Sequence, residues 1–200
     1  MRPTETTGIE LERRDDLAAL RLVSADGSNR LTLKTINRLT TAVETLAPGG
    51  LPLVLCGNQR FFSAGADLNE IASLHGVSAL EFARSGQRLM DAIDGYPALT
   101  IAAIEGYCMG GGLDLALACD GRIASPHAIF GHRGAALGII TGWGGTQRLP
   151  RLVGRARAMQ NFLAAETIHA ERALAIGLVD AIAADPVSAA KARIRSSRAT

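Results

Sequence analysis

The residues best suited to chemistry follow a run of three glycines in the middle of the chain. Gly110, Gly111 and Gly112 lie between segment 100–104, an apolar run of strand length, and segment 113–119, which is typical of a buried helix. Glycines at such a turn allow unusual dihedrals and let another group approach the backbone closely. The first amides of a helix lack internal partners and lie at the positive end of its dipole. We therefore expect this turn to hold an anion, or an oxygen that becomes negative during a reaction.

A second glycine turn strengthens this chemical interpretation. A glycine triplet alone more often reflects tight packing or a helix cap, and the Gly-x-Gly-x-x-Gly pattern of dinucleotide-binding turns is absent from the sequence. The segment Phe-Phe-Ser-Ala-Gly-Ala-Asp-Leu at 61–68 follows an apolar strand candidate at 53–56 and leads into helical spacing. Two such turns could direct the backbone amides of Ala66 and Gly111 at one point.

Asp114 and His132 are the side chains that could move protons beside these turns. Asp114 comes three residues after Gly111, so one helical turn places it near the amides, and its apolar neighbours could raise its pKa. Alternatively, its carboxylate only caps or pairs at the helix start, where an acid is stabilised anyway. His132 could act as a base near neutral pH, or it could face solvent or pack at a subunit or loop contact.

The composition is that of an ordinary globular protein. The chain has 200 residues, of which 48% are hydrophobic and 20% charged, with a net charge of +2. Aromatic residues make up 4%, which argues against a surface that stacks nucleic-acid bases. The three cysteines lie in apolar segments, so we expect buried free thiols in a reducing compartment. No Cys/His spacing matches a zinc site, and we expect no metal.

The sequence also bears on the location of the protein. The N-terminal residues are polar and lack the apolar core of a secretory signal. No apolar run reaches the ~20 residues that are needed to span a bilayer. We therefore expect a cytoplasmic protein without a membrane partner and without a nucleic-acid partner.

Strand and helix patterns alternate along the chain, which indicates an α/β fold. Segments 9–13 and 17–23 predict a hairpin, and Thr32 predicts the N-cap of a helix that extends to residue 46. Ser78 is expected to cap a longer helix. The other expected elements are strands at 53–56, 100–104, 121–124 and 128–131, helices at 66–74, 113–119, 146–153, 154–165 and 171–176, an extended segment at 178–183, and a terminal helix from 185 to about 198.

Several motifs, taken in this order, resemble the enoyl-CoA hydratase/isomerase family, also called the crotonase family. The resemblance extends from about residue 29 onward. The segments that carry it are 62–68, 101–120, 130–131, 144–149 and 173–179.

The resemblance implies a fold and an assembly. It predicts a crotonase-like spiral of strand-strand-helix repeats, with residues 1–183 as the core domain and 184–200 as a C-terminal helix. The C-terminal helical region is shorter than is usual in the family. The family resemblance also implies a homo-oligomer, either a trimer or a dimer of trimers.

The resemblance further assigns roles to backbone groups and to the substrate. Residues that match Ala66 and Gly111 donate the two hydrogen bonds of an oxyanion hole, which stabilises the enolate of a thioester. Residues that match Ala64, Asp67 and Leu68 lie against the adenine end of coenzyme A. The implied substrate is therefore an acyl-CoA thioester of fatty acid metabolism, and coenzyme A enters as part of that substrate rather than as a permanently bound cofactor.

The acid and base positions depart from the family pattern. The first family acid falls at Asp114, where most hydratases carry Glu, and the second falls at Gly134, which cannot transfer a proton. His132 lies close to this vacant position. Hydration or isomerisation of an enoyl-CoA is the leading hypothesis. The alternatives are an acyl-CoA decarboxylase, a thioester hydrolase, and a catalytically degraded protein that binds acyl-CoA or a partner.

Overall fold

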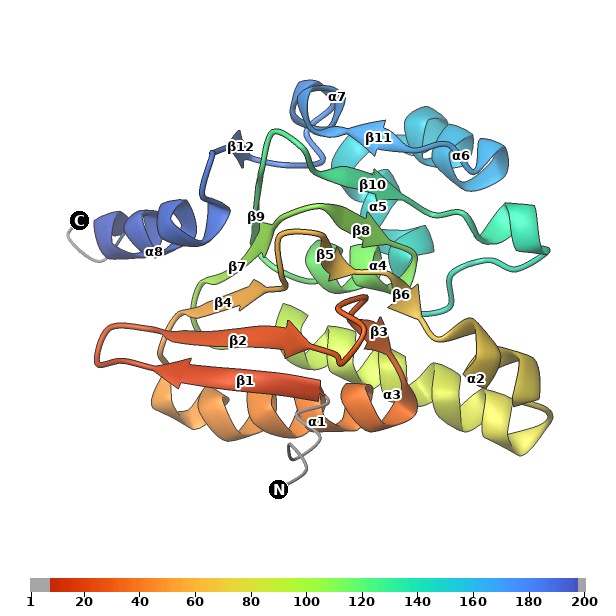
Figure 1. The fold of residues 1–200 in the computed structure, drawn as a ribbon, viewed down its shortest axis with the longest axis horizontal. Helices are drawn as coiled ribbons and strands as arrows, with labels where there is room; N and C mark the ends of the chain where they lie inside the picture. Colours follow the sequence, from red (N-terminus) through yellow and green to blue (C-terminus); the bar gives the residue numbers. More distant parts are fainter. Residues whose placement is uncertain (1–7, 198–200) are drawn as a thin grey trace.

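A mostly parallel sheet, extended at one edge by an N-terminal hairpin, organises the fold (Figure 1). The computed structural model describes residues 8–197. The large sheet contains β1 (Gly8–Arg13), β2 (Ala18–Val23), β4 (Leu53–Cys56), β7 (Thr100–Ile104), β9 (Gly121–Ala124) and β12 (Ala181–Ile182). Within the described residues these strands form a six-stranded sheet in the order β1-β2-β4-β7-β9-β12.

Short strands form two further sheets beside the large one. They are β3 (Arg30–Leu31), β5 (Phe61–Ser63), β6 (Gly65–Ala66), β8 (Tyr107–Met109), β10 (Ile129–Gly131) and β11 (Ile168–His169). Across residues 8–197, β11-β10-β8-β5 make a four-stranded sheet and β3-β6 a two-stranded one. The large-sheet strands β2, β4, β7 and β9 are each followed by one or two small-sheet strands and then a helix, which confirms the predicted spiral of strand-strand-helix turns.

Helices cover both faces of the large sheet and surround the smaller sheets (Figure 1). The α-helices are α1 (Leu33–Leu46), α2 (Leu68–Ser73), α3 (Val77–Asp94), α4 (Gly111–Leu117), α5 (Gly145–Val153), α6 (Arg155–Ala164), α7 (Ala170–Ala175) and α8 (Pro186–Ser197), and the 3-10 helices are η1 (Ala47–Gly49) and η2 (Gly134–Leu137). Between residues 8 and 197, no helix combines the length and apolar character that crossing a membrane would require.

The large sheet separates two hydrophobic cores. Side chains alternate between the faces of a strand, so Leu53 and Leu55 of β4 pack into the core with α1 and α3, whereas Val54 and Cys56 face α8. All four of these side chains are buried. Burial on both faces explains why β4 and β7 are continuous apolar runs rather than alternating ones.

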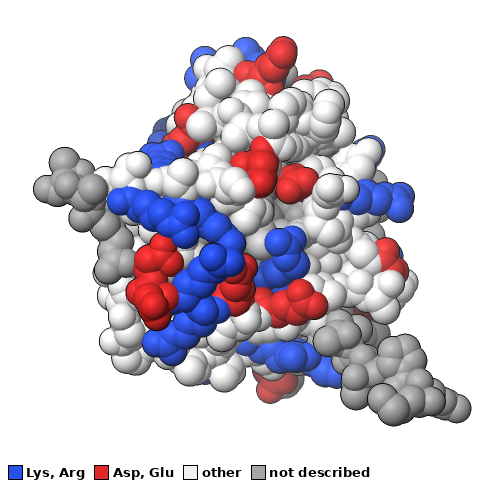
Figure 2. Space-filling model, turned by 60° about the vertical axis from the view of Figure 1, so that its left-hand side comes forward, with Lys and Arg blue, Asp and Glu red and all other residues white. Residues whose placement is uncertain are grey.

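Helix α8 is fixed to the sheet mainly by apolar burial. Its Ile194 is fully buried in the second core. On the surface, Lys191 pairs with Glu12 at 3.2 Å and Arg195 pairs with Asp16 at 2.7 Å, and Figure 2 shows basic and acidic side chains interleaved on this side. Such exposed pairs contribute little to stability, and the mixture of signs does not form a basic surface for nucleic acid.

Most of the predicted elements are confirmed, including the hairpin, the buried strands and helix α5 with Pro150 inside it. Thr32 is the N-cap of α1, because its hydroxyl accepts a hydrogen bond from the Thr35 amide at 3.1 Å. This contact satisfies one of the first free amides of the helix. Local capping chemistry was therefore a sound guide at this helix.

Other local predictions were wrong. Helix α3 begins at Val77 with Gly76 at its N-cap, while the Ser78 hydroxyl donates to the His75 carbonyl at 2.9 Å. The predicted helix over 66–74 begins only at Leu68, because Ala66 belongs to β6. Of the extended segment 178–183, only β12 is paired as a strand. Strands of two or three residues, such as β6, carry too little periodicity to be recognised from sequence.

Candidate active site

A cavity of about 510 Å³ lies between the glycine turn at the start of α4, helices α2 and α3, and the segment after β10. This volume is within the usual range for small-molecule sites. The cavity wall is mostly apolar. Its polar lining side chains are Asp114, His132, Arg133 and Thr141.

The glycine turn between β8 and α4 lines this cavity. Gly110 has φ +51°, a left-handed conformation that favours glycine, and its N–H donates to the Gly131 carbonyl at 2.9 Å. Its carbonyl accepts the first helical hydrogen bonds, from Leu113 at 2.9 Å and from Asp114 at 3.0 Å. The amide of Gly111 precedes these donors, so it has no carbonyl partner within the helix.

The amide of Ala66 lies next to that of Gly111. In β6, the Asp67 N–H donates to the Leu31 carbonyl of β3 at 3.4 Å. Because the backbone direction alternates along a strand, the Ala66 N–H faces away from β3. An ideal Cβ placed on Gly111 would lie 3.4 Å from the Ala66 nitrogen, and one placed on Gly65 would lie 3.0 Å from the Gly111 nitrogen. The two glycine turns therefore lie next to each other.

Asp114 and His132 form a buried pair beside this point. Asp114 is 1% exposed and His132 is 4% exposed. His132 Nε2 lies 3.4 Å from Asp114 Oδ1, but the alignment is not that of a hydrogen bond, and neither atom has another hydrogen-bond partner among the described residues. The hydroxyl of Thr141 donates to Asp114 Oδ2. One carboxylate oxygen is therefore anchored, and the other faces only the imidazole.

Burial moves the pKa values of this pair in opposite directions. Desolvation raises the pKa of Asp114 from 3.8 to about 7, and the Thr141 hydrogen bond and the Arg148 charge oppose that rise. Desolvation lowers the pKa of His132 from 6.5 to about 4. Near pH 6 both groups are therefore neutral. The one titratable proton of the pair is on Asp114, and His132 is a neutral imidazole.

Close packing fixes the pair in the cavity wall. A Cβ on Gly145 would clash with Asp114 Oδ1 and would lie 3.1 Å from His132 Cε1, so only glycine fits there. On its other side, the His132 ring packs against Phe162, with ring centroids 5.1 Å apart. Sequence reasoning did not assign Gly145 or Thr141 to the site. The segment is rich in glycines, and glycine lets another group approach the backbone closely.

Gly134, the vacant acid position, has no room for a side chain. An ideal Cβ there would lie 2.5 Å from the Ile139 carbonyl oxygen. A Cβ on Gly142, which also lines the cavity, would meet nothing within 4 Å. The segment that follows η2 therefore closes the direction in which a carboxylate at position 134 would extend.

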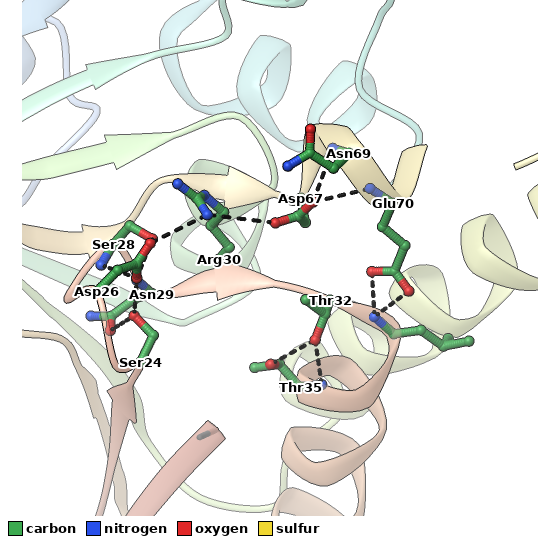
Figure 3. A network of polar contacts seen from close by, with 11 residues as sticks. Ser24, Asp26, Ser28, Asn29, Arg30, Thr32, Thr35, Asp67, Asn69 and Glu70 are labelled. Carbon is green, nitrogen blue, oxygen red and sulfur yellow. Dashed lines mark hydrogen bonds and ion pairs between the residues drawn. The ribbon is translucent and has the colours of Figure 1, made fainter. Parts of the chain in front are cut away.

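The structure places the three residues matched to coenzyme A in two different settings. Ala64 and Leu68 line the cavity. The Asp67 carboxylate instead accepts N–H bonds from Asn69 at 2.9 Å and Glu70 at 3.0 Å, which makes it the N-cap of α2 (Figure 3). The structure thus gives the Asp67 side chain a structural task that the sequence analysis had not assigned.

Metal-binding groups are not part of this arrangement. In the part of the chain that the structure describes, no group of three or more His, Cys, Asp and Glu side chains is placed to hold a metal ion. The three cysteines are buried and free, as expected. The polar groups at the cavity are therefore the side chains of Asp114, His132, Arg133 and Thr141, together with the backbone amides of Ala66 and Gly111.

Comparisons with known proteins identify a family for the chain. Residues 12–198 match the enoyl-CoA hydratase/isomerase family. The chain is 40% identical to "Probable enoyl-CoA hydratase" of Bacillus subtilis, over 86% of this chain and 67% of the relative. It is 39% identical to "Crotonyl-CoA hydratase" of Syntrophomonas wolfei, over 87% of this chain and 68% of the relative.

The fold leads to the same group of proteins. The crystal structure of an enoyl-CoA hydratase from Bacillus anthracis superimposes with a TM-score of 0.86 at 31% identity, and the match covers 95% of this chain and 74% of that one. The structure of Pseudomonas aeruginosa DspI superimposes with a TM-score of 0.90 at 35% identity, and the match covers 98% of this chain and 76% of that one. Fold and sequence agree, and the chain is a member of the enoyl-CoA hydratase/isomerase family.

Proposed function

We propose that the protein adds water across the double bond of a 2-enoyl-CoA thioester. The observation that carries this proposal is the buried pair of Asp114 and His132, whose facing atoms lie 3.4 Å apart beside the amides of Ala66 and Gly111. Hydration needs one group that takes a proton from water and one that gives a proton to carbon. A neutral imidazole and a protonated carboxyl group supply both.

The two amides would hold the thioester oxygen. As water attacks the β-carbon, negative charge develops on that oxygen, and fixed N–H groups need not reorient to stabilise it. Loss of one such donor typically costs about 3 kcal/mol in the transition state. The backbone amides of Ala66 and Gly111 would therefore supply a large share of the catalysis.

The proton steps follow from the neutral forms of the pair. His132 accepts a proton from water as the water oxygen bonds to the β-carbon, and Asp114 gives its proton to the α-carbon as the enolate returns to a carbonyl. The elements of one water molecule are then added. The pair is left as carboxylate and imidazolium, and return of a proton from His132 to Asp114 restores it once their facing atoms, 3.4 Å apart in this structure, come within hydrogen-bond distance.

Coenzyme A would enter as the carrier of the acyl group. Ala64 and Leu68 at the cavity would contact it, and Asp67 would contribute through its backbone because its carboxylate caps α2. The relative named crotonyl-CoA hydratase, at 39% identity, supports a thioester substrate with a conjugated double bond.

Isomerisation is a second candidate, because the position of the second acid is closed. The Ile139 carbonyl lies 2.5 Å from where a Cβ of Gly134 would be. Asp114 is then the one carboxyl group among the polar residues that line the described cavity. A single carboxyl group can move a proton from one carbon to another, which is all that a double-bond shift requires.

The test is turnover of crotonyl-CoA, followed by loss of the conjugated enoyl absorbance and by identification of the product. Hydration predicts 3-hydroxybutyryl-CoA, with activity strongly reduced in both Asp114→Asn and His132→Gln. Asp120→Asn is the matched control, since that carboxylate accepts its hydrogen bonds from Thr100 at 2.8 and 2.9 Å rather than facing the cavity. Full activity in His132→Gln would contradict the assignment of the imidazole.

A further inference from the structure

Trp143 is the only tryptophan in the sequence, and it lies in the wall of the cavity. It is 5% exposed, within the glycine-rich segment that precedes α5. Neither the amides nor the proton-transfer pair explains why a large aromatic ring occupies this place. Its surroundings indicate a task in substrate selection.

Two glycines on different helices make room for the indole ring. A Cβ on Gly86 of α3 would clash with its Nε1, and a Cβ on Gly111 of α4 would clash with its Cζ3. The Phe82 ring packs against it with centroids 5.3 Å apart. The ring is therefore held between α3 and α4, and close packing leaves it little freedom to move aside.

Hydrogen bonds hold the backbone on which the ring is mounted. The Gly142 carbonyl accepts from Gln87 Nε2 at 2.9 Å, which ties the segment to α3. The Trp143 carbonyl accepts from Arg148 Nη1 at 3.4 Å, and Arg148 also pairs with Asp91 of α3 at 3.2 Å. The position of the ring is thus fixed from both the side-chain and the backbone ends.

The ring edge of Trp143 and the Ala66 amide both lie next to Gly111. An ideal Cβ on Gly111 would clash with the six-membered part of the indole and would lie 3.4 Å from the Ala66 nitrogen. If the amides of Ala66 and Gly111 hold the carbonyl oxygen of a thioester, the acyl group of that thioester starts beside Gly111. The first carbons of that group would therefore pass along the ring edge of Trp143.

We propose that Trp143 is a specificity-determining residue that admits acyl groups without a branch at the α-carbon. This inference rests on the proposed placement of a thioester at the two amides. A planar, unbranched enoyl group can lie along the ring edge, whereas a methyl group on the α-carbon adds volume next to a ring that cannot move aside. One methylene group in an apolar pocket changes specificity by about 10- to 200-fold.

The experiment compares crotonyl-CoA with 2-methylcrotonyl-CoA in the parent protein, Trp143→Phe and Trp143→Ala. We expect the parent to prefer the unbranched substrate by at least about tenfold in kcat/KM. We expect Trp143→Ala to reduce that ratio by about tenfold or more, with Trp143→Phe between the two. A ratio that is unchanged in Trp143→Ala would overturn the proposal.

Binding measurements separate this inference from the proposed reaction. Butyryl-CoA and 2-methylbutyryl-CoA are titrated calorimetrically, and Trp143 fluorescence is followed in the parent. If the parent turns over no enoyl-CoA, the proposed reaction fails, while a preference for butyryl-CoA that Trp143→Ala removes still supports the inference. Saturation with butyryl-CoA without any change in Trp143 emission would overturn it.

A matched control accounts for the loss of a buried aromatic ring. Tyr96 is 8% exposed and does not line the cavity; its hydroxyl donates to the Leu51 carbonyl at 3.0 Å. Tyr96→Ala should lower stability but leave the ratio of branched to unbranched substrate as in the parent. A shift in Tyr96→Ala equal to that in Trp143→Ala would show that lost packing alone explains the effect, which also overturns the proposal.

Discussion

The two halves of the candidate site are built in different ways. The amides of Ala66 and Gly111 are backbone groups positioned by glycine turns, and their charge distribution does not depend on pH. Asp114 and His132 are side chains whose neutral forms depend on burial and on each other. The first half should tolerate most side-chain changes but no added Cβ, whereas the second should respond to single-atom changes and to pH.

Asp114→Asn should have the largest effect and should separate these halves most clearly. A positioned acid or base typically contributes about 10²- to 10⁴-fold to the rate, so kcat should fall by that factor. A purely capping carboxylate predicts no such loss, because asparagine also caps helices well. Steady-state kinetics with crotonyl-CoA measure this directly.

The stability of the same variant should move in the opposite direction. The pKa of Asp114 is raised from 3.8 to about 7, so ionisation of its carboxyl group above pH 7 costs the folded state up to about 4 kcal/mol. Asparagine cannot ionise, so Asp114→Asn should be more stable than the parent at pH 8. Urea denaturation at pH 8 would contradict this account if the variant were less stable.

Gly111→Ala tests the backbone half. The added Cβ would clash with Trp143 and would lie 3.4 Å from the Ala66 nitrogen, so the amide geometry must change. Loss of one such donor predicts a kcat about 10²- to 10³-fold lower. Gly49→Ala is the control, since a Cβ there has its nearest contact, with Arg13, at 3.7 Å. Equal kinetics in the two variants would remove Gly111 from the site.

The pH dependence of stability tests whether Asp114 and His132 share one proton. Between pH 4 and 6.5 the folded pair carries one proton, on Asp114, and the unfolded chain also carries one, on His132. The folded and unfolded states then bind the same number of protons. The contribution of the pair to the free energy of unfolding should therefore not change with pH in this range.

In each single variant, the shifted pKa of the remaining group should make stability depend on pH. In Asp114→Asn, the lowered pKa of His132 remains, so stability relative to the parent should rise by about 3 kcal/mol from pH 4 to 6.5. In His132→Gln, the raised pKa of Asp114 should make relative stability fall by a similar amount. Taking differences from the parent removes the contributions of surface carboxylates such as Asp26, whose pKa is lowered to about 2. Parallel pH profiles for parent and variants would contradict the shared proton.

The smallest expected effect is that of Gly134→Ala, at the closed acid position, on stability. Gly134→Ala places a Cβ 2.5 Å from the Ile139 carbonyl oxygen, so the segment after η2 must shift, at a cost of about 1–3 kcal/mol. Gly142→Ala, whose Cβ meets nothing within 4 Å, should change stability much less. Thermal unfolding of both variants checks the comparison; equal stabilities would mean that the space beside Gly134 is open.

Local chemistry was enough to predict the two glycine turns. The glycine turns before α2 and α4 could be recognised from strand-length apolar runs and helix-start patterns, and the apolar neighbours of Asp114 correctly indicated its burial and raised pKa. These features depend on residues that are close in sequence, so short-range patterns contain the necessary information.

The side-chain half depends on contacts between distant segments. Thr141 anchors Asp114 across 27 residues, Gly145 packs against the same carboxylate, and the Ile139 carbonyl closes the space beside Gly134. The pairing of His132 with Asp114 likewise requires β10 to lie beside β8. Such contacts follow from how the spiral closes on itself, which spacing along the chain does not reveal.

The most direct test is a crystal structure of the protein with bound butyryl-CoA. The account predicts that the thioester oxygen lies 2.7–3.1 Å from the nitrogens of both Ala66 and Gly111, with the α-carbon facing Asp114 and the ring edge of Trp143 alongside. A thioester oxygen that lies away from either nitrogen, or a Gly111 amide bonded to another protein group, would contradict it.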